Sequence, residues 1–320
     1  MNPNTVLGLD IGGANLKAAT AAGQAVSVPF PLWKQPDALP AALAELVGRF
    51  PGIDELAVTM TGELCDCYET KREGVNAILD AVECVANGRP VRIWSTAGRF
   101  VSISEARQNH LELAAANWHA LATFAGRYAP HGRAVLFDTG STTTDIIPLN
   151  DGVPCAAGRT DWERLLTGEL VYRGVGRTPV HAVLTQGVCA ELFATTQDAY
   201  VVLGHIPENA ENRDTADGRP LTREKSLARL ARMIGGDCET HSEAAILDFA
   251  NRVHLRLLAE LSVALRKHDA NMVIASGAGE FLVRLVLAAE GATRYFSLNA
   301  ALGPAISSCA PAYALAVLAE

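Results

Sequence analysis

The sequence predicts an α/β protein of two domains, and three observations support this prediction. The chain has 320 residues, about twice the length of a typical domain, and 49% of them are hydrophobic, so a large core can form. Short apolar strands alternate along the chain with segments of helical periodicity. A pattern of apolar strand, Asp, any residue, Gly and polar strand occurs twice, around Asp10 and around Asp138. One copy in each half of the chain is expected of a two-domain protein.

Charge and cysteine usage narrow the class of protein. The formal net charge is −8, which argues against a general binder of nucleic acid or of anionic membranes, since both require a basic surface. No stretch of about 18 uninterrupted apolar residues is present. Seven scattered cysteines fit a reduced protein, and the start MNPNTV has no secretory pattern. We therefore expect a cytoplasmic protein without nucleic-acid or membrane partners, and a homo-oligomer remains open.

The first half of the chain begins with a predicted β-hairpin. Two short strands, 5–11 and 14–20, meet at Gly12-Gly13. Helical spacing then covers 36–50, and strand patterns cover 55–61 and 91–96. Ser102 with Glu105 forms a capping-box pattern that opens one long predicted helix at 105–128.

The second half begins after Pro130 and Gly132 with a predicted strand at 134–139. Residues 205–222 are polar and rich in turn formers, which predicts a long exposed loop, and such loops often serve function. A helix over 223–234 ends at Gly235-Gly236. Thr240 and Glu243 form a second capping-box pattern before a helix over 243–268, and 272–283 indicates strand, glycine turn and helix.

The two hairpins match in detail. Asp10 aligns with Asp138, and Gly12 aligns with Gly140. Lys17 follows its aspartate by seven residues, and Asp145 follows Asp138 by the same number. This echo predicts a duplicated hairpin, one in each domain.

A glycine turn after an apolar strand is typical of phosphate binding, and two common folds are excluded here. A Walker A loop requires G-x-x-x-x-G-K-[ST] and a following helix, and a Rossmann turn requires G-x-G-x-x-G before a helix. The segment ANLKAAT alternates like a strand instead. Two facing hairpins therefore predict a phosphate clamp, in which glycines allow backbone N–H groups to approach the phosphate closely. The candidate phosphate-binding residues are Gly12, Gly13, Thr139, Gly140, Ser141 and Thr142.

These two hairpins and the turn SGAGE at 276–280 resemble the phosphate and adenosine motifs of the acetate and sugar kinase/Hsc70/actin superfamily. The resemblance implies two ribonuclease-H-like domains around an interdomain cleft, with Gly277 and Gly279 in nucleotide or diphosphate binding. It implies a first domain at 1–130, a second domain at 131–300 and a C-terminal connecting helix at 301–320. The segments 105–128 and 302–319 are the candidate helices crossing the hinge.

A narrower resemblance rests on five segments spread along the chain. They resemble hydantoinase/oxoprolinase-related proteins that accompany tetrahydromethanopterin-linked one-carbon genes. Archaeal members act in methanofuran biosynthesis. The resemblance implies a transferase that joins an (aminomethyl)furanylmethyl diphosphate to the phenol of γ-glutamyltyramine and releases diphosphate. The segments are TGELCDCYETKREGV (61–75), AAANWHALA (114–122), RTDWERLLTGELVYRGVGRTPV (159–180), ELFATTQDAYVVLG (191–204) and TADGRPLTREKSLARLARMIGGD (215–237).

This chemistry assigns expected roles to the candidate residues. Asp10 and Asp138 would hold Mg²⁺, Lys17 would neutralise a phosphate oxygen, and Asp138 or Asp145 would take the phenol proton. Asp145 could instead pair with a surface arginine. A second group of charged residues would contact substrate, although such charge runs are usually solvated. This group comprises Glu63, Asp66, Lys71, Arg72, Arg173 and Arg177.

Two other functions remain open from the sequence. An ATP-dependent small-molecule kinase would bind adenosine at 276–280, but Ala275-Ser276 stands where many kinases carry a glycine pair. A non-catalytic, nucleotide-gated module is the other alternative, and the chain lacks the length for an additional client-binding domain.

Overall fold

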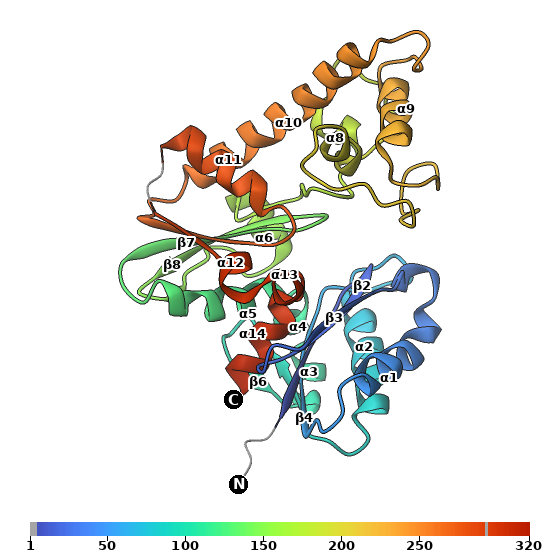
Figure 1. Cartoon of the computed structure of the whole chain (residues 1–320). Helices are drawn as coiled ribbons and strands as arrows, with labels where there is room; N and C mark the ends of the chain where they lie inside the picture. The colour runs from blue at the N-terminus through green and yellow to red at the C-terminus, as the bar shows by residue number, and fades with distance from the viewer. Residues whose placement is uncertain (1–4, 292–293) are drawn as a thin grey trace.

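The computed structural model describes residues 5–291 and 294–320, so most of the segment MNPNTV lies outside the described residues. The chain forms two mixed β-sheets with helices around each, and the C-terminal helices lie between the sheets (Figure 1). The α/β architecture predicted from the sequence is confirmed. No helix within the described part of the chain has the length and apolar character needed to span a membrane.

The N-terminal sheet is built from the first six strands in the order β3-β2-β1-β4-β5-β6. The first three strands are antiparallel neighbours, whereas β4 runs parallel to β1 and to β5. The predicted hairpin and the strands at 55–61 and 91–96 are therefore confirmed, and β3 is an addition. The strands are β1 (Val6–Ile11), β2 (Asn15–Thr20), β3 (Ala25–Pro29), β4 (Glu55–Met60), β5 (Val91–Trp94) and β6 (Phe100–Val101).

The C-terminal sheet has the order β10-β8-β7-β11-β12, and β9 pairs with β8 outside this path. As in the N-terminal sheet, an antiparallel hairpin (β7-β8) adjoins a parallel strand (β11). The strands are β7 (Arg133–Thr139), β8 (Thr144–Asn150), β9 (Val153–Pro154), β10 (Leu170–Val171), β11 (Met272–Ser276) and β12 (Tyr295–Ser297).

The helices follow the strands in two groups. Those before β7 are α1 (Leu39–Gly48), α2 (Lys71–Ala86), α3 (Ile103–Gln108), α4 (His110–Leu113) and α5 (Asn117–Ala125). Those after β8 are α6 (Asp161–Thr167), α7 (Val180–Val183), α8 (Thr196–Val202), α9 (Arg223–Met233), α10 (Glu243–Leu265), α11 (Glu280–Glu290), α12 (Leu298–Leu302), α13 (Pro304–Ser308) and α14 (Ala310–Ala319). Short 3-10 helices cover Leu32–Lys34, Pro36–Ala38 and Gly126–Tyr128.

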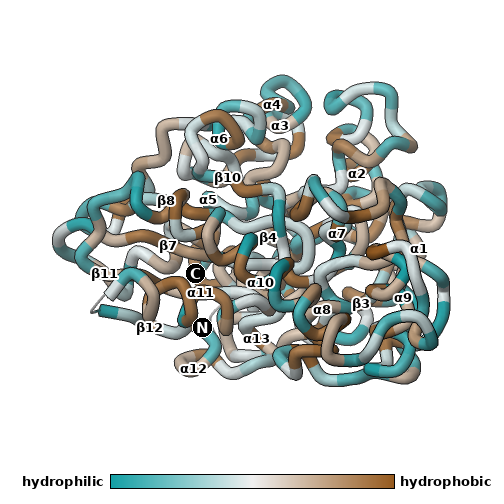
Figure 2. The backbone as a smooth tube through the Cα atoms, turned by 90° about the horizontal axis from the view of Figure 1, so that it is seen from above, coloured by the Kyte–Doolittle hydropathy of each residue, from teal (hydrophilic) through white to brown (hydrophobic). Residues whose placement is uncertain are grey.

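Apolar side chains from the two sheets form separate cores. One core joins the N-terminal sheet to α1 and α2, and another joins β7 and β8 to α8, α9, α10 and α11. A third cluster connects α5, α14 and the other face of β7 and β8. Seen from above, β7 and β8 are largely hydrophobic (Figure 2). Burial of these strand faces positions the hairpin ends, which carry the aspartates.

Helix α14 packs directly on β1 because Gly8 has no side chain. A Cβ at Gly8 would lie 1.8 Å from the carbonyl oxygen of Ala312. The ring of Tyr313 meets Phe124 of α5 with 5.4 Å between centroids, so α14 also holds α5. Helix α14 therefore contacts both the N-terminal sheet and α5.

Replacing Gly8 by Ala should lower the free energy of unfolding by about 1–3 kcal/mol, since an overpacked contact forces backbone to shift. Urea denaturation measures this change. Gly48→Ala is the matched control, because a Cβ at Gly48, at the exposed end of α1, meets nothing within 4 Å. Equal stability of the two variants would contradict the close approach of α14 to β1.

The predicted single helix at 105–128 is wrong. The segment divides into α3, α4 and α5, and Ala115 between α4 and α5 has a φ of +49°. The capping role predicted for Ser102 is confirmed, since its hydroxyl accepts a hydrogen bond from the N–H of Glu105. The segment 302–319 is likewise divided, into α13 and α14, where Cys309 leaves helical geometry.

The helix expected at 243–268 is present as α10, but its predicted cap is wrong. Ser242 caps the helix by accepting from the N–H of Ala245, whereas Thr240 bonds the side chain of Asp237 in the preceding turn. Residues 205–222 contain no helix or named strand, only an isolated bridge between Asn209 and Leu221, so the predicted loop is confirmed.

Candidate active site

The first hairpin holds a buried carboxylate beside a lysine. Asp10 and Lys17 are cross-strand partners in the β1-β2 register, as their spacing in the sequence requires. The N–H of Gly12 donates to the carbonyl of Asn15 at 3.0 Å and closes the turn. Asp10 is only 5% exposed, and its Oδ1 atom has no hydrogen-bond partner among the described residues. A buried, unsatisfied carboxylate oxygen calls for a ligand.

The second hairpin repeats this geometry. Asp138 and Asp145 are cross-strand partners in the β7-β8 register. The N–H of Gly140 donates to the carbonyl of Thr143 at 2.8 Å, which matches the bond made by Gly12. The duplicated hairpin predicted from the sequence is therefore present in both sheets.

The two hairpins face each other closely enough for their charges to interact. Burial raises the pKa of Asp138, while the positive charge of Lys17 lowers it and the negative charge of Asp10 raises it further. Burial also raises the pKa of Asp10, and Lys17 again acts against this rise. The structure thus brings together Asp10, Lys17 and Asp138, which the sequence placed in one site.

A loop from residues 174 to 177 supports the second hairpin. The N–H groups of Gly176 and Arg177 both donate to the carbonyl of Ser141, at 2.9 and 2.8 Å. The guanidinium of Arg177 donates to the hydroxyl of Thr142 at 2.8 Å. A Cβ at Gly176 would lie 2.2 Å from Ser141 Oγ, so a side chain at this position would displace that hydroxyl. The predicted residues Ser141, Thr142 and Arg177 therefore meet at the turn.

The turn at 277–279 packs on the same hairpin. The N–H of Gly279 donates to the carbonyl of Thr139 at 2.8 Å, and a Cβ at Gly277 would lie 2.3 Å from that oxygen. Gly277 has a φ of +88°, a conformation that favours glycine. Both glycines thus bring β11 against Thr139, and the N–H of Gly279 is already bonded within the protein.

The candidate residues after β4 lie in different surroundings. Glu63 is buried, whereas Asp66 and Arg72 are exposed and Lys71 is half-buried. The loop after β4 contacts the first hairpin, since the N–H of Gly62 donates to the carbonyl of Ile11 at 3.1 Å. The positive charge of Arg177, from the opposite sheet, acts on the thiol of Cys65 in this loop. The loop after β4 and the loop after β10 therefore face each other.

Arg173 does not point toward this group. Its guanidinium donates to the carbonyls of Tyr172 and Ala182, both at 2.9 Å, and lies 3.6 Å from Glu260 of α10. The contacts of this side chain hold β10 to α7 and α10, and only the backbone of Arg173 meets the second hairpin, where its carbonyl accepts from the hydroxyl of Thr144 at 2.8 Å.

Asp145 forms an ion pair with Arg164 of α6, a residue missed by the sequence analysis. Arg164 is 1% exposed and lies over the ring of Trp118 with 4.3 Å to the centroid. Burial raises the pKa of Asp145 to about 6, although Arg164 opposes this rise. The alternative in which Asp145 pairs with an arginine is therefore correct, but its prediction of a surface arginine is wrong, because Arg164 is buried. Its signal in the sequence was its position directly after Glu163, which forms a capping box with Thr160.

Glu63 carries an unusual carboxyl group. Its Oε2 atom is buried without a partner in the described parts of the chain. Burial raises the pKa of Glu63 to about 7, against the opposing charge of Lys71, and the charge of Asp161 adds to the rise. The backbone of Ala115, at the break between α4 and α5, also contacts this carboxyl group. The left-handed Ala115 therefore adjoins the site.

Glu63→Gln should remove a pH-dependent term from folding stability. Because the folded-state pKa is raised, the native protein holds the proton more tightly, so wild-type stability falls from about pH 4.5 to 7. The variant should gain up to about 3 kcal/mol relative to wild type between pH 5 and pH 8, since one pKa unit corresponds to about 1.4 kcal/mol. Urea denaturation of both proteins at the two pH values tests this. A difference that does not change with pH would contradict the prediction.

The sequence of the chain matches a known protein family. A sequence profile described as hydantoinase/oxoprolinase matches residues 54–320. The chain belongs to the hydantoinase/oxoprolinase family. This membership confirms the family resemblance drawn from the sequence.

Two curated relatives bear the same name, (4-{4-[2-(γ-L-glutamylamino)ethyl]phenoxymethyl}furan-2-yl)methanamine synthase. The protein of Methanocaldococcus jannaschii is 34% identical over 331 residues, covering 98% of this chain and 97% of its own. The protein of Methanococcus vannielii is 30% identical over 199 residues, covering 58% of this chain and 89% of its own.

Solved structures confirm the predicted sugar kinase/Hsc70/actin type of fold. A ROK family glucokinase from Streptomyces griseus with glucose and AMPPNP superposes with a TM-score of 0.51 at 13% identity, covering 98% of this chain and 99% of its own. A nucleotide-free acetone carboxylase superposes with a TM-score of 0.52 at 13% identity, covering 98% of this chain and 70% of its own. At such identity the likeness is one of fold.

Proposed function

We propose that this protein is a transferase that forms an aryl ether in methanofuran-type cofactor biosynthesis. It joins an (aminomethyl)furanylmethyl diphosphate to the phenol oxygen of γ-glutamyltyramine. The observation that carries this proposal is the 34% identical relative, which matches the chain almost end to end and is named for synthesis of such an ether. The facing hairpins supply a site suited to the leaving diphosphate.

In the proposed reaction, the bond between the furanylmethyl carbon and the diphosphate oxygen breaks, and a bond from that carbon to the phenol oxygen forms. The electron pair of the broken bond leaves with diphosphate. Lys17 and the backbone N–H groups of the two turns, other than those of Gly12 and Gly140 that close the turns, stabilise this developing charge, which is the largest contribution expected of the protein. The glycines at 12, 13 and 140 allow the phosphates to approach the backbone.

The phenol proton passes to a carboxylate of the second hairpin, Asp138 or Asp145. Asp145 is already engaged in an ion pair with buried Arg164, which opposes the rise of its pKa and leaves it less available to the phenol. Asp138 faces Lys17 and Asp10 and has no arginine partner in the described residues. Asp145 with Arg164 then fixes the orientation of the hairpin.

The carboxylates fit a Mg²⁺ ion. The described residues contain no cluster of three or more metal-ligating side chains, but Mg²⁺ bound with a diphosphate commonly needs only one or two carboxylates. Asp10, with its unpartnered buried oxygen, and Asp138 across from it would hold the ion. Bound there, Mg²⁺ would neutralise the charge of the diphosphate.

The experiment combines purified protein, the furanylmethyl diphosphate, γ-glutamyltyramine and Mg²⁺ without ATP. Mass spectrometry should detect the ether, with one diphosphate released for each ether formed, and chelation of Mg²⁺ should stop the reaction. Absence of ether with every phenol tested would overturn the proposal. Transfer of phosphate from ATP to a small molecule would instead support the kinase alternative that the fold allows.

A further inference from the structure

Outside the hairpins, the structure contains a pocket with apolar and charged walls. It has a volume of about 240 Å³ and lies between the segment before α8, the loop at 205–222 and the end of α9. Leu192 and Phe193 form its apolar side. Its remaining lining residues are Ala216, Asp217, Arg219 and Arg232.

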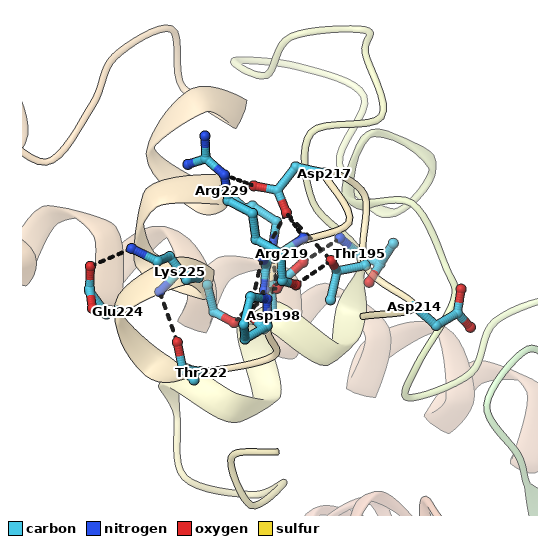
Figure 3. Close-up of polar contacts among 12 residues, drawn as sticks. Thr195, Asp198, Asp214, Asp217, Arg219, Thr222, Glu224, Lys225 and Arg229 are labelled. Carbon is cyan, nitrogen blue, oxygen red and sulfur yellow. Dashed lines mark hydrogen bonds and ion pairs between the residues drawn. The ribbon is translucent and has the colours of Figure 1, made fainter. Parts of the chain in front are cut away.

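The charged side of the pocket rests on a buried network. Arg229, 0% exposed, donates to Asp198 at 2.8 Å and to Asp217 at 3.0 Å, as Figure 3 shows. Asp217 also accepts from the N–H of Arg219 at 3.1 Å. Arg229 in α9 and the N–H of Arg219 in the loop therefore hold one oxygen of the Asp217 carboxylate. The second oxygen, Oδ2, is left to face the pocket.

Two arginines flank that second oxygen without closing on it. Asp217 Oδ2 lies 3.9 Å from Arg219 Nε and 3.8 Å from Arg232 Nη1. Both guanidinium groups are exposed and make no other ion pair within the described residues. With Asp198 and Arg229 included, three arginines meet two aspartates, so the cluster retains one positive charge.

This arrangement suits the end of a γ-linked glutamyl group. Such a group has a free carboxylate, a free ammonium and two methylene groups. Arginines bind carboxylates with paired N–H donors, Asp217 suits the ammonium, and Leu192 with Phe193 suits the methylenes. A ligand without its carboxylate would leave the arginines without a partner. A ligand without its ammonium would leave Asp217 without one, and a ligand without methylene groups would leave Leu192 and Phe193 uncovered.

The pocket is linked to the proposed active site through α8. The backbone N–H of Gln197, at the start of α8, donates to the carbonyl of Gly176 in the loop that supports Ser141. The side chain of Gln197 donates to the carbonyl of Asp214 at 2.7 Å, three residues before Asp217. Gln197 therefore connects the loop beside the second hairpin to the loop that lines the pocket, and an acceptor with a phenol at one end and a zwitterion at the other has one end for each.

We propose that this pocket binds the α-amino-acid end of the γ-glutamyl acceptor and selects it over an acceptor lacking that end. The proposal rests on the proposed function for the identity of the acceptor. Arg219 and Arg232 act in specificity, and the chemistry remains at the hairpins.

The kinetic test compares γ-glutamyltyramine with tyramine as acceptors. Arg219→Ala and Arg232→Ala should each lower kcat/KM for γ-glutamyltyramine by about 10- to 100-fold, the range expected for a lost hydrogen bond to a charged group. The loss should lie in KM, and the rate with tyramine should not change. Arg223→Ala, a partly exposed arginine on α9 that pairs with Glu243, is the matched control. Equal losses with both acceptors, or no loss, would overturn the proposal.

A binding test separates failure of this inference from failure of the proposed function. Calorimetry with γ-glutamyltyramine alone needs no turnover. Binding by the wild type and by Arg223→Ala, lost in Arg219→Ala and Arg232→Ala, supports the pocket even if no ether forms. Absence of binding to the wild type, or equal binding by all four proteins, overturns it whatever the reaction proves to be.

Discussion

Asp10→Asn will lower kcat for diphosphate release by about 100- to 1,000-fold, because the neutral amide would hold Mg²⁺ less well and the leaving diphosphate would lose that electrostatic stabilisation. Asn keeps the shape of the side chain and removes its charge. Asp10 is the carboxylate whose buried Oδ1 has no partner within the described chain, so its charge has no evident role in holding the fold. Initial rates at saturating concentrations of both substrates measure the effect.

Stability distinguishes this loss from misfolding. Burial raises the pKa of Asp10, which means that its negative charge is unfavourable in the folded protein. The Asn variant should therefore unfold at the same or a higher urea concentration than wild type, as expected where an active site costs stability. Asp248→Asn, at an exposed position on α10, controls for loss of one negative charge. Full activity of Asp10→Asn would remove the first hairpin from the mechanism.

The hairpins could be predicted from sequence because their signal is local. The seven-residue spacing of Asp10 to Lys17 and of Asp138 to Asp145 fixes the register of each hairpin, and the structure has both pairs in that register. Glycine at the turn was equally informative, because Gly12 and Gly140 close the turns with matching hydrogen bonds. Distances along the chain sufficed for these conclusions.

Other features depend on contacts between segments far apart in the sequence. From the sequence alone, Arg164 has the pattern of an exposed helix residue. In the folded structure, its guanidinium lies over the ring of Trp118 and pairs with Asp145. Arg173 and Arg177 have similar glycine neighbours, yet only Arg177 turns toward the hairpin. The helix break at Ala115 could not be predicted, because it lies in an alanine-rich segment that favours helix. Only the folded structure places the backbone of Ala115 beside the carboxyl group of Glu63.

The pocket could not be predicted from the sequence, although the loop that forms part of it could. Polar composition at 205–222 predicted an exposed, functional loop. It could not show that Asp217 folds back onto Arg229 or that Arg232, from the last turn of α9, completes the wall. The buried pair beneath the loop decides this arrangement.

Arg229→Ala is the substitution expected to destabilise the protein most, by about 3–5 kcal/mol, because it leaves Asp198 charged and buried without its partner. Both side chains are 0% exposed, and Asp198 also accepts from the hydroxyl of Ser226 and the N–H of Thr195. Urea denaturation measures the loss, and Arg223→Ala again provides the exposed control. A loss below 1 kcal/mol would show that water or another cation replaces the guanidinium.

A double variant separates the strength of this pair from its effect on the pocket. Asp198→Leu with Arg229→Met removes both charges and keeps most of the volume, so it should recover a large part of the stability lost in Arg229→Ala. It should not restore the fixed position of Asp217, because the hydrogen bond from Arg229 is absent. A stable double variant that binds γ-glutamyltyramine weakly would mean that this ion pair is kept for the shape of the pocket rather than for the stability of the fold.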